Sequence, residues 1–144
     1  MKTENDITRF LEIQNNPFSG YAVALKEIQL GKKTSHWIWY IFPQLRHLGR
    51  SSRAYYYGIA DREEAMKYLE HETLSGRLRE ISMALLEHKN LSAVRILGKI
   101  DAMKVQSCMT LFDILSPNDV FGDVLNALYD GQRDVRTVEI LIKN

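Results

Sequence analysis

The chain has 144 residues, of which 45% are hydrophobic and 26% are charged, with 19 Lys and Arg against 18 Asp and Glu. This length and composition indicate one globular domain that buries its own core, and they exclude an intrinsically disordered chain. The net charge of +1 excludes a strongly basic nucleic-acid binder, at least as a property of the whole molecule.

Hydrophobic periodicity is helical almost throughout, and capping or breaking residues mark where the helices begin and end. The predicted helices, with these residues in parentheses, are 6–14 (Asp6), 17–31 (Pro17 and Gly31), 35–41 (Ser35, with an end near Phe42 before Pro43), 61–70 (Asp61), 74–88, 92–98 (Ser92 and Gly98), 101–115 (Asp101), 118–129 (Asn118) and a last helix capped by Asp134. Residues 44–52 are predicted to form a loop, and only 55–59 have strand-like content.

Two of these helices carry further expectations. Residues 108–115 are apolar nearly all round, which predicts a central, largely buried helix. In the last helix, Val135, Val138 and Leu141 are expected to face inward. The whole pattern predicts an all-α single domain over residues 1–144, with about eight or nine short helices, too irregular for a four-helix bundle.

The charge is unevenly distributed along the chain. No Asp or Glu occurs from Ile28 to Ala60, so this window carries a formal charge of +5 and the rest of the chain carries −4. The same window contains half of the aromatic residues, including both tryptophans. A segment that is both basic and aromatic in an otherwise acidic chain is the strongest compositional signal of the sequence.

Cysteine usage and the absence of long apolar runs bear on the compartment. The single cysteine, Cys108, excludes an internal disulfide and the zinc sites built on paired cysteines. The first nine residues lack the apolar core and cleavage site of a signal peptide. The longest uncharged run, around residues 37–42, is far shorter than the about 20 residues that a membrane helix needs. We therefore expect a cytoplasmic protein without a membrane partner.

Within the basic window, residues 35–45 read Ser-His-Trp-Ile-Trp-Tyr-Ile-Phe-Pro-Gln-Leu. Large rings such as Trp39 and Phe42 commonly anchor a core. The polar His36 and Gln44 flank this apolar patch, so they are either satisfied structural groups or ligand-binding ones. The next residues, 46–53, contain three arginines, which could form a cradle for an anion through Arg50 and Ser51 or a solvated loop.

A third candidate element lies in the predicted helix 101–115. Lys104 and Ser107 are one turn apart and could act as a base and a nucleophile, or as two donors to one anion. Cys108 in an apolar helix is more typical of a small core residue than of a reactive thiol. The four histidines show no metal-ligand spacing, so neither a metal nor a cofactor is predicted.

The segment 35–45, taken with Lys104, Ser107 and the Met-Thr-Leu-Phe run at 109–112, resembles the bacterial family described as domain of unknown function 1810, which is often misnamed calpastatin. The similarity runs from about residue 7 to 141. The resemblance implies a mainly α-helical fold of its own type and no established activity. The calpastatin label finds no support, because calpastatin is disordered and this composition folds.

Two positions depart from the family pattern. The chain has Lys99-Ile100-Asp101 where the family usually has a Pro-Asp pair, and Arg53 stands where a Met is common. A binding role for Arg53 is therefore not implied by the resemblance.

These signals together predict one polar pocket with walls from residues 35–52 and the turn 104–107. The expected ligand is a small anion, nucleotide-like or a phosphorylated metabolite, on which Trp37 would stack while Lys104 neutralises its charge. His36 is the only candidate general base, and the sequence leaves catalysis open. The predicted ligand-binding residues are His36, Trp37, Gln44, Arg50, Ser51, Lys104 and Ser107.

Two alternatives stay open at this stage. The chain could be a binding module without chemistry that presents a basic-aromatic surface to a protein or to single-stranded nucleic acid. The conspicuous residues could also serve folding alone, with the aromatic rings in the core and Gln44 and Ser107 capping helices. The sequence does not indicate an oligomeric state.

Overall fold

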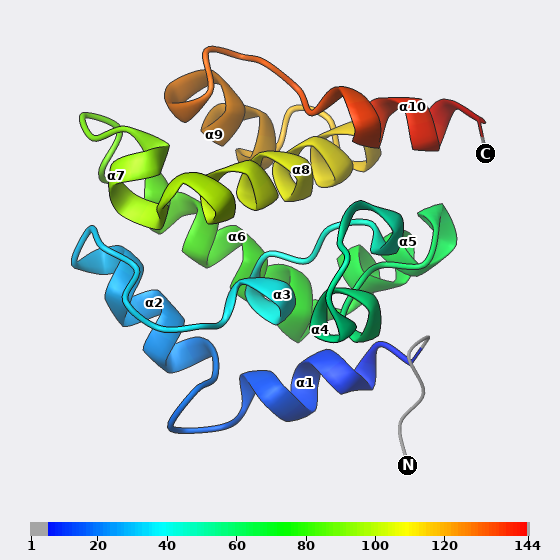
Figure 1. Ribbon diagram of the computed structural model, residues 1–144, viewed down its shortest axis with the longest axis horizontal. Helices are drawn as coiled ribbons and strands as arrows, with labels where there is room; N and C mark the ends of the chain where they lie inside the picture. The colour runs from blue at the N-terminus through cyan, green and yellow to red at the C-terminus, as the bar shows by residue number, and fades with distance from the viewer. Residues whose placement is uncertain (1–5, 144) are drawn as a thin grey trace.

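Helix α8 (Lys99–Leu115) crosses the middle of the molecule, and the other elements are arranged around it (Figure 1). The computed structural model describes residues 6–143, and within this range the chain forms ten α-helices and one short 3-10 helix, η1, without a β-strand. The remaining elements are α1 (Thr8–Gln14), α2 (Tyr21–Gln29), α3 (Ile38–Ile41), η1 (Arg46–Leu48), α4 (Ser52–Tyr56), α5 (Arg62–Glu70), α6 (Glu72–Leu86), α7 (Ala93–Leu97), α9 (Val120–Leu128) and α10 (Val135–Lys143).

This arrangement confirms the predicted all-α single domain, with ten α-helices among the described residues rather than the predicted eight or nine. Helices α9 and α10 contact one side of α8, and α3 contacts it from the opposite side (Figure 1). Within residues 6–143, no helix combines the length and the apolar character that a membrane span requires.

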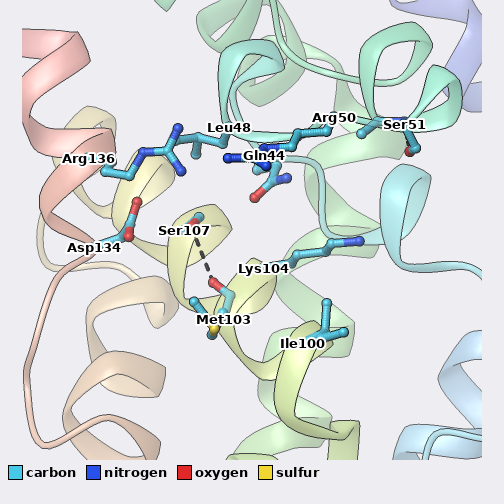
Figure 2. Close-up of a pocket in the computed structure, with 12 residues that line it drawn as sticks. Gln44, Leu48, Arg50, Ser51, Ile100, Met103, Lys104, Ser107, Asp134 and Arg136 are labelled. Atoms are coloured by element: carbon cyan, nitrogen blue, oxygen red, sulfur yellow. Dashed lines mark hydrogen bonds between the residues drawn. The ribbon is translucent and has the colours of Figure 1, made fainter.

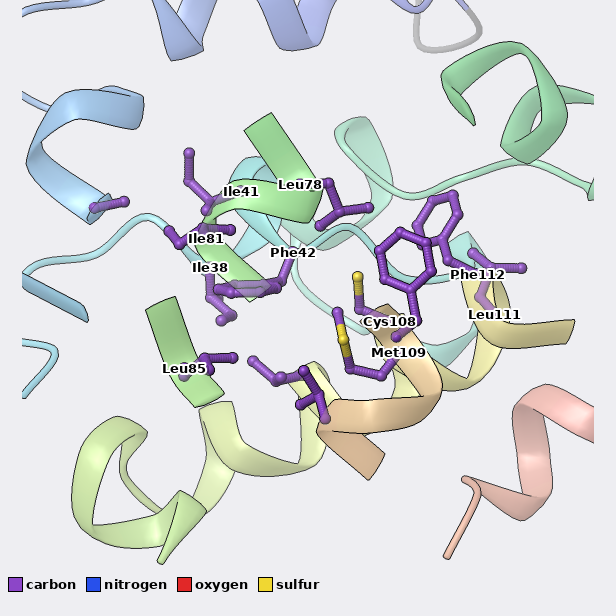
Figure 3. Close-up of a cluster of buried hydrophobic side chains, with 14 of the residues drawn as sticks. Ile38, Ile41, Phe42, Leu78, Ile81, Leu85, Cys108, Met109, Leu111 and Phe112 are labelled. Carbon is purple, nitrogen blue, oxygen red and sulfur yellow. The ribbon is translucent and has the colours of Figure 1, made fainter. Parts of the chain in front are cut away.

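The centre of the core lies between α3, α6 and α8 (Figure 3). In α8 every residue from Ser107 to Phe112 is buried, as the apolar character of this stretch predicted, whereas residues 113–115 are only half-buried. The side chains that meet there are Ile38, Ile41, Phe42, Leu78, Ile81, Leu85, Cys108, Met109, Leu111 and Phe112.

Several predicted helix boundaries are confirmed because their determinants are local. The Asp61 carboxylate accepts a hydrogen bond from the Glu64 N–H at 2.9 Å, and the Ser92 hydroxyl accepts one from the Arg95 N–H at 3.1 Å. Both are N-caps, which satisfy backbone donors that the first turn leaves free. Gly31 follows α2 with a φ of 84°, a left-handed conformation that glycine adopts without strain.

Three predicted helix starts are wrong. Pro17 lies in a turn instead of a first helical turn, because the Asn16 side chain accepts from the Phe18 N–H, and α2 begins only at Tyr21. Ser35 does not cap α3, since its hydroxyl binds Glu27 at 2.5 Å. Asp101 lies inside the first turn of α8, which begins at Lys99, and its carboxylate pairs instead with Lys33.

Two further expectations, for the last two helices, also need correction. Asp119 caps α9 in place of Asn118, which has a left-handed φ of 65°. Val135 is exposed, because the buried face of α10 is formed by Thr137 and Leu141. The stretch 55–59, the only one with strand-like content, completes α4 and then contributes an isolated bridge to Leu45, in agreement with the all-α prediction.

Candidate ligand-binding site

A cavity of about 340 Å³ opens between the loop around Gln44 to Ser51, the first half of α8 and the start of α10 (Figure 2). This volume is within the range of small-molecule pockets, which is roughly 300–1,000 Å³. Five of the predicted ligand-binding residues line it, namely Gln44, Arg50, Ser51, Lys104 and Ser107.

The pocket loop is held in place by backbone pairing and close packing. The Arg46 N–H donates to the Ile59 carbonyl and the Ile59 N–H donates to the Gln44 carbonyl, both at 2.8 Å. Gly49 packs so closely on Ala54 that a Cβ at position 49 would collide with the Ala54 methyl group. Ser51 then caps α4 by accepting from the Ala54 N–H at 3.0 Å. Arg50 therefore projects from a fixed stretch of backbone.

Cations predominate in the lining. Arg50, Lys104 and Arg136 contribute positive charge, and Asp134 is the only carboxylate among the lining residues. In Figure 2 the guanidinium groups of Arg50 and Arg136 point toward each other from opposite walls, whereas the Lys104 ammonium points away from Arg136, toward α3. Charge at the pocket therefore lies in two separate places.

Asp134 is already engaged in local structure. Its Oδ2 accepts from the backbone N–H of Thr137 at 3.0 Å and from the Thr137 hydroxyl, and its own N–H donates to the Thr110 hydroxyl at 2.9 Å. The carboxylate thus caps the first turn of α10, as predicted from the sequence. Because Asp134 fixes the start of α10 in this way, Arg136, two residues later, is positioned at the pocket.

Lys104 lies between the pocket and the indole of Trp39. Its Nζ is 5.4 Å from the centre of the Trp39 ring and 4.0 Å from Oδ1 of Asp101. The other oxygen of Asp101 is closer to a competing cation, since Oδ2 lies 2.7 Å from Nζ of Lys33. Because Asp101 is shared in this way, the positive charge of Lys104 is only partly offset.

The burial and hydrogen bonding of Ser107 do not suit a nucleophile. Its side chain is buried, and its hydroxyl donates to the Met103 carbonyl one turn earlier at 3.2 Å. A nucleophilic serine needs a base within hydrogen-bonding reach. The hydrogen bond of Ser107 goes to the backbone and not to Lys104, so the reading as a base and nucleophile pair finds no support in the geometry.

The first two predicted site residues, His36 and Trp37, do not line the pocket. His36 is exposed on the segment before α3. Trp37 has no exposed surface, and its indole N–H donates to Oε1 of Glu27 at 2.9 Å. The stacking role expected for Trp37 is therefore wrong, because neither face of its ring is open to a ligand.

Sequence reasoning did not anticipate Arg136, Ile100 and Met103 in the lining. Arg136 lies 32 residues after Lys104, and no local pattern joins the two. Ile100 and Met103 are apolar residues one turn apart on α8, but their exposure, 70% and 63%, is visible only in the structure.

The residues described by the structure offer no metal centre and no reactive thiol. Over residues 6–143, no group of three or more His, Cys, Asp and Glu side chains is placed to hold a metal ion. Cys108 is fully buried, and burial raises the pKa of its thiol well above the usual value. Its prediction as a small core residue is confirmed.

The comparisons with known proteins find a family model and a solved structure that match the chain. A family model described as "Protein of unknown function (DUF1810)" matches residues 4–141. The chain is similar to the crystal structure of the conserved hypothetical protein Rv1873 from Mycobacterium tuberculosis, with a TM-score of 0.90 and 39% identity over 95% of this chain and 96% of that one. Among curated proteins, none matches the chain.

Proposed function

The chain belongs to the family described as protein of unknown function (DUF1810), as its 35–45 motif predicted, and we propose that it binds a small anionic ligand in the pocket between the 44–51 loop, α8 and α10. The ligand class is a phosphorylated metabolite or a nucleotide-like molecule.

The observation that carries this proposal is the charge of the lining. Three cationic residues line one cavity, with Arg50 and Arg136 pointing toward each other, and the single carboxylate in the lining, Asp134, is used to cap α10. A planar guanidinium offers forked donors that match phosphate or carboxylate oxygens. Two such groups on opposite walls, Arg50 and Arg136, can hold an anion from both sides (Figure 2).

The apolar part of the lining favours an organic ligand over a bare inorganic ion. Leu48, Ile100 and Met103 line the same cavity as the cations. Covering Ile100 and Met103, which are largely exposed, removes apolar surface from water and stabilises a complex by about 25 cal/mol for each Å². A ligand with a carbon skeleton next to its charge gains from both parts of the pocket.

Binding without acid–base catalysis is the simplest role for this lining. General acid–base chemistry usually draws on a histidine or a free carboxylate with a pKa near the working pH. No histidine lines the cavity, and His36, the base considered from the sequence, lies outside it. The lining therefore supports recognition of a ligand rather than its turnover.

The alternative, a basic-aromatic surface for a protein or single-stranded nucleic acid, has less support. Base stacking requires exposed rings. In the basic window Trp37, Tyr40 and Phe42 are buried, and Tyr55 is the only aromatic side chain that is more than half exposed. A cytoplasmic location belongs to the same proposal and rests on the single free thiol of Cys108.

A thermal-shift screen tests the proposal with matched pairs of compounds. Each nucleotide or sugar phosphate is compared with its nucleoside or sugar at equal concentration. A phosphorylated ligand at 100 times its dissociation constant should raise the free energy of unfolding by about 2.7 kcal/mol, and its partner without phosphate should not. A screen in which no phosphorylated compound shifts the melting temperature contradicts the proposal. Stabilisation by oligothymidylate alone would favour the nucleic-acid alternative.

A further inference from the structure

The indole of Trp39 carries a polar atom that the fold leaves without a partner. Its Nε1 is buried, and it forms no hydrogen bond with any of the described residues. Buried N–H groups are hydrogen-bonded in the great majority of cases, because an unpaired donor loses its hydration without compensation. Trp37 shows the contrast, since its indole N–H binds Glu27.

Trp39 lines a second, small cavity that adjoins the pocket. The volume of this cavity is about 10 Å³, and Gln44, Ala54 and Lys104 line both it and the larger cavity. Space of this size is about the minimum for one water-sized group, so it can admit a single oxygen atom and excludes a tetrahedral phosphate group. The small cavity is therefore a second place for a ligand atom, distinct from the space between Arg50 and Arg136.

The charges around Trp39 favour an acceptor with negative charge. The guanidinium carbon of Arg53 lies 5.1 Å from the ring centre and the Lys104 ammonium lies 5.4 Å from it. Positive charge beside a buried donor strengthens the binding of an anionic oxygen in a medium of low dielectric constant. Asp101 is the nearby carboxylate, and its oxygens are shared between Lys104 and Lys33.

We infer that the ligand has two acceptor groups: a phosphate-like anion held between Arg50 and Arg136, and a carboxylate whose oxygen enters the small cavity and accepts from Nε1 of Trp39. This inference rests on the proposed function and narrows its ligand class to phosphorylated carboxylic acids. Gln44 and Lys104, which line both cavities, are the side chains next to the connecting part of such a ligand.

The test uses the full chain labelled with nitrogen-15 and a series of phosphonates that end in a carboxylate: phosphonoacetate, 3-phosphonopropionate and 4-phosphonobutyrate. Each is titrated beside the alkylphosphonate of the same skeleton without the carboxylate. The two indole N–H signals report on Trp37 and Trp39 separately, and Trp39→Phe identifies which signal belongs to Trp39. The measurements are the dissociation constants and the shifts of the two indole signals.

At least one carboxylate compound should bind about tenfold more tightly than its alkyl match, the gain expected of a charged hydrogen bond, and should move the Trp39 signal but not that of Trp37. In Trp39→Phe the affinity ratio of that pair should fall to about one. Equal affinities in every pair, or an unmoved Trp39 signal, would overturn this inference while leaving the proposed anion site intact. If no phosphonate binds at all, the proposed function fails and the inference fails with it.

Discussion

The carboxylate of Glu27 on α2 holds the indole of Trp37, with Oε1 2.9 Å from Nε1. The same carboxylate accepts from the Ser35 hydroxyl and from the backbone N–H groups of Thr34 and Ser35. Four donors from one short segment therefore converge on one side chain. Burial alone raises the pKa of Glu27, but the hydrogen bonds outweigh it and lower the pKa to about 2.

The first prediction concerns the effect of pH on this contact. A lowered pKa stabilises the fold fully above the unfolded value of 4.5, and the contribution disappears as the pH falls to about 2. Glu27→Gln, which cannot carry the charge, should reduce the free energy of unfolding at pH 7 by about 2 kcal/mol, a figure that allows for solvent screening. Denaturant titrations at several pH values measure the difference between the two proteins. This difference should shrink between pH 4.5 and 2, and a constant difference across that window would contradict the assignment.

Glu27 also shows why part of the fold could not be predicted from the sequence. The N-caps at Asp61 and Ser92 were predictable because each binds an N–H three residues away. Ser35 looked like an equally good cap, but it binds Glu27, eight residues earlier on a different helix. A local pattern cannot show whether a serine hydroxyl will cap the next helix or will bind an acceptor on another helix. The prediction for Ser35 was wrong for this reason.

In the candidate site, too, the local part could be predicted from the sequence and the part that depends on tertiary packing could not. Gln44, Arg50 and Ser51 are close in sequence and lie on one wall, which the composition of the basic window indicated. Arg136 joins them only through the packing of α10 on α8, a relationship between residues far apart in the chain. Conversely, aromatic content alone could not distinguish a ring available for stacking from one in the core, and Trp37 proved to be in the core.

The second prediction concerns the buried ion pair of Arg9 and Glu64. Nη1 of Arg9 lies 2.9 Å from Oε2 of Glu64, and the two side chains are 0% and 6% exposed. Arg9 also donates to the carbonyls of Tyr56 and Gly58, which precede the bridge between Ile59 and the pocket loop. Arg9→Met leaves the Glu64 carboxylate buried without its cation and should cost about 3–5 kcal/mol of stability, measured by denaturant titration.

The double variant Arg9→Met with Glu64→Leu separates the cost of an unpaired buried charge from the other contributions of Arg9 to stability. Removing both charges should recover part of the loss, because the unpaired carboxylate is gone while the Tyr56 carbonyl still lacks the donor that Arg9 supplied. The Gly58 carbonyl keeps a second donor, since Nη2 of Arg46 lies 3.2 Å from it. A loss below about 1 kcal/mol in Arg9→Met would show that the pair does not stabilise the fold as described.

The third prediction concerns the contact of Gly49 with Ala54. A methyl group at position 49 would collide with the Ala54 side chain, so Gly49→Ala should displace α4 and cost about 1–3 kcal/mol of stability. It should also weaken anion binding, because Arg50 follows directly. Gly76→Ala is the matched control, since nothing lies within 4 Å of its added methyl group. In the middle of α6 that change should stabilise by about 0.5–1 kcal/mol, and thermal melts of both variants test the pair.

The fourth prediction concerns the two guanidinium groups of the pocket. Arg50→Gln and Arg136→Gln each remove one forked donor, so each should weaken the binding of a phosphorylated hit from the screen about tenfold or more. Calorimetric titration of the folded variants measures this loss of affinity. The loss should become smaller as salt is added, because salt screens the attraction between each guanidinium group and the ligand. Arg62→Gln makes the same change of charge on the exposed start of α5, outside the pocket, and should leave the affinity unaltered. Equal losses in all three variants would mean that the ligand responds only to the overall charge of the protein, and the pocket between Arg50 and Arg136 would not be its site.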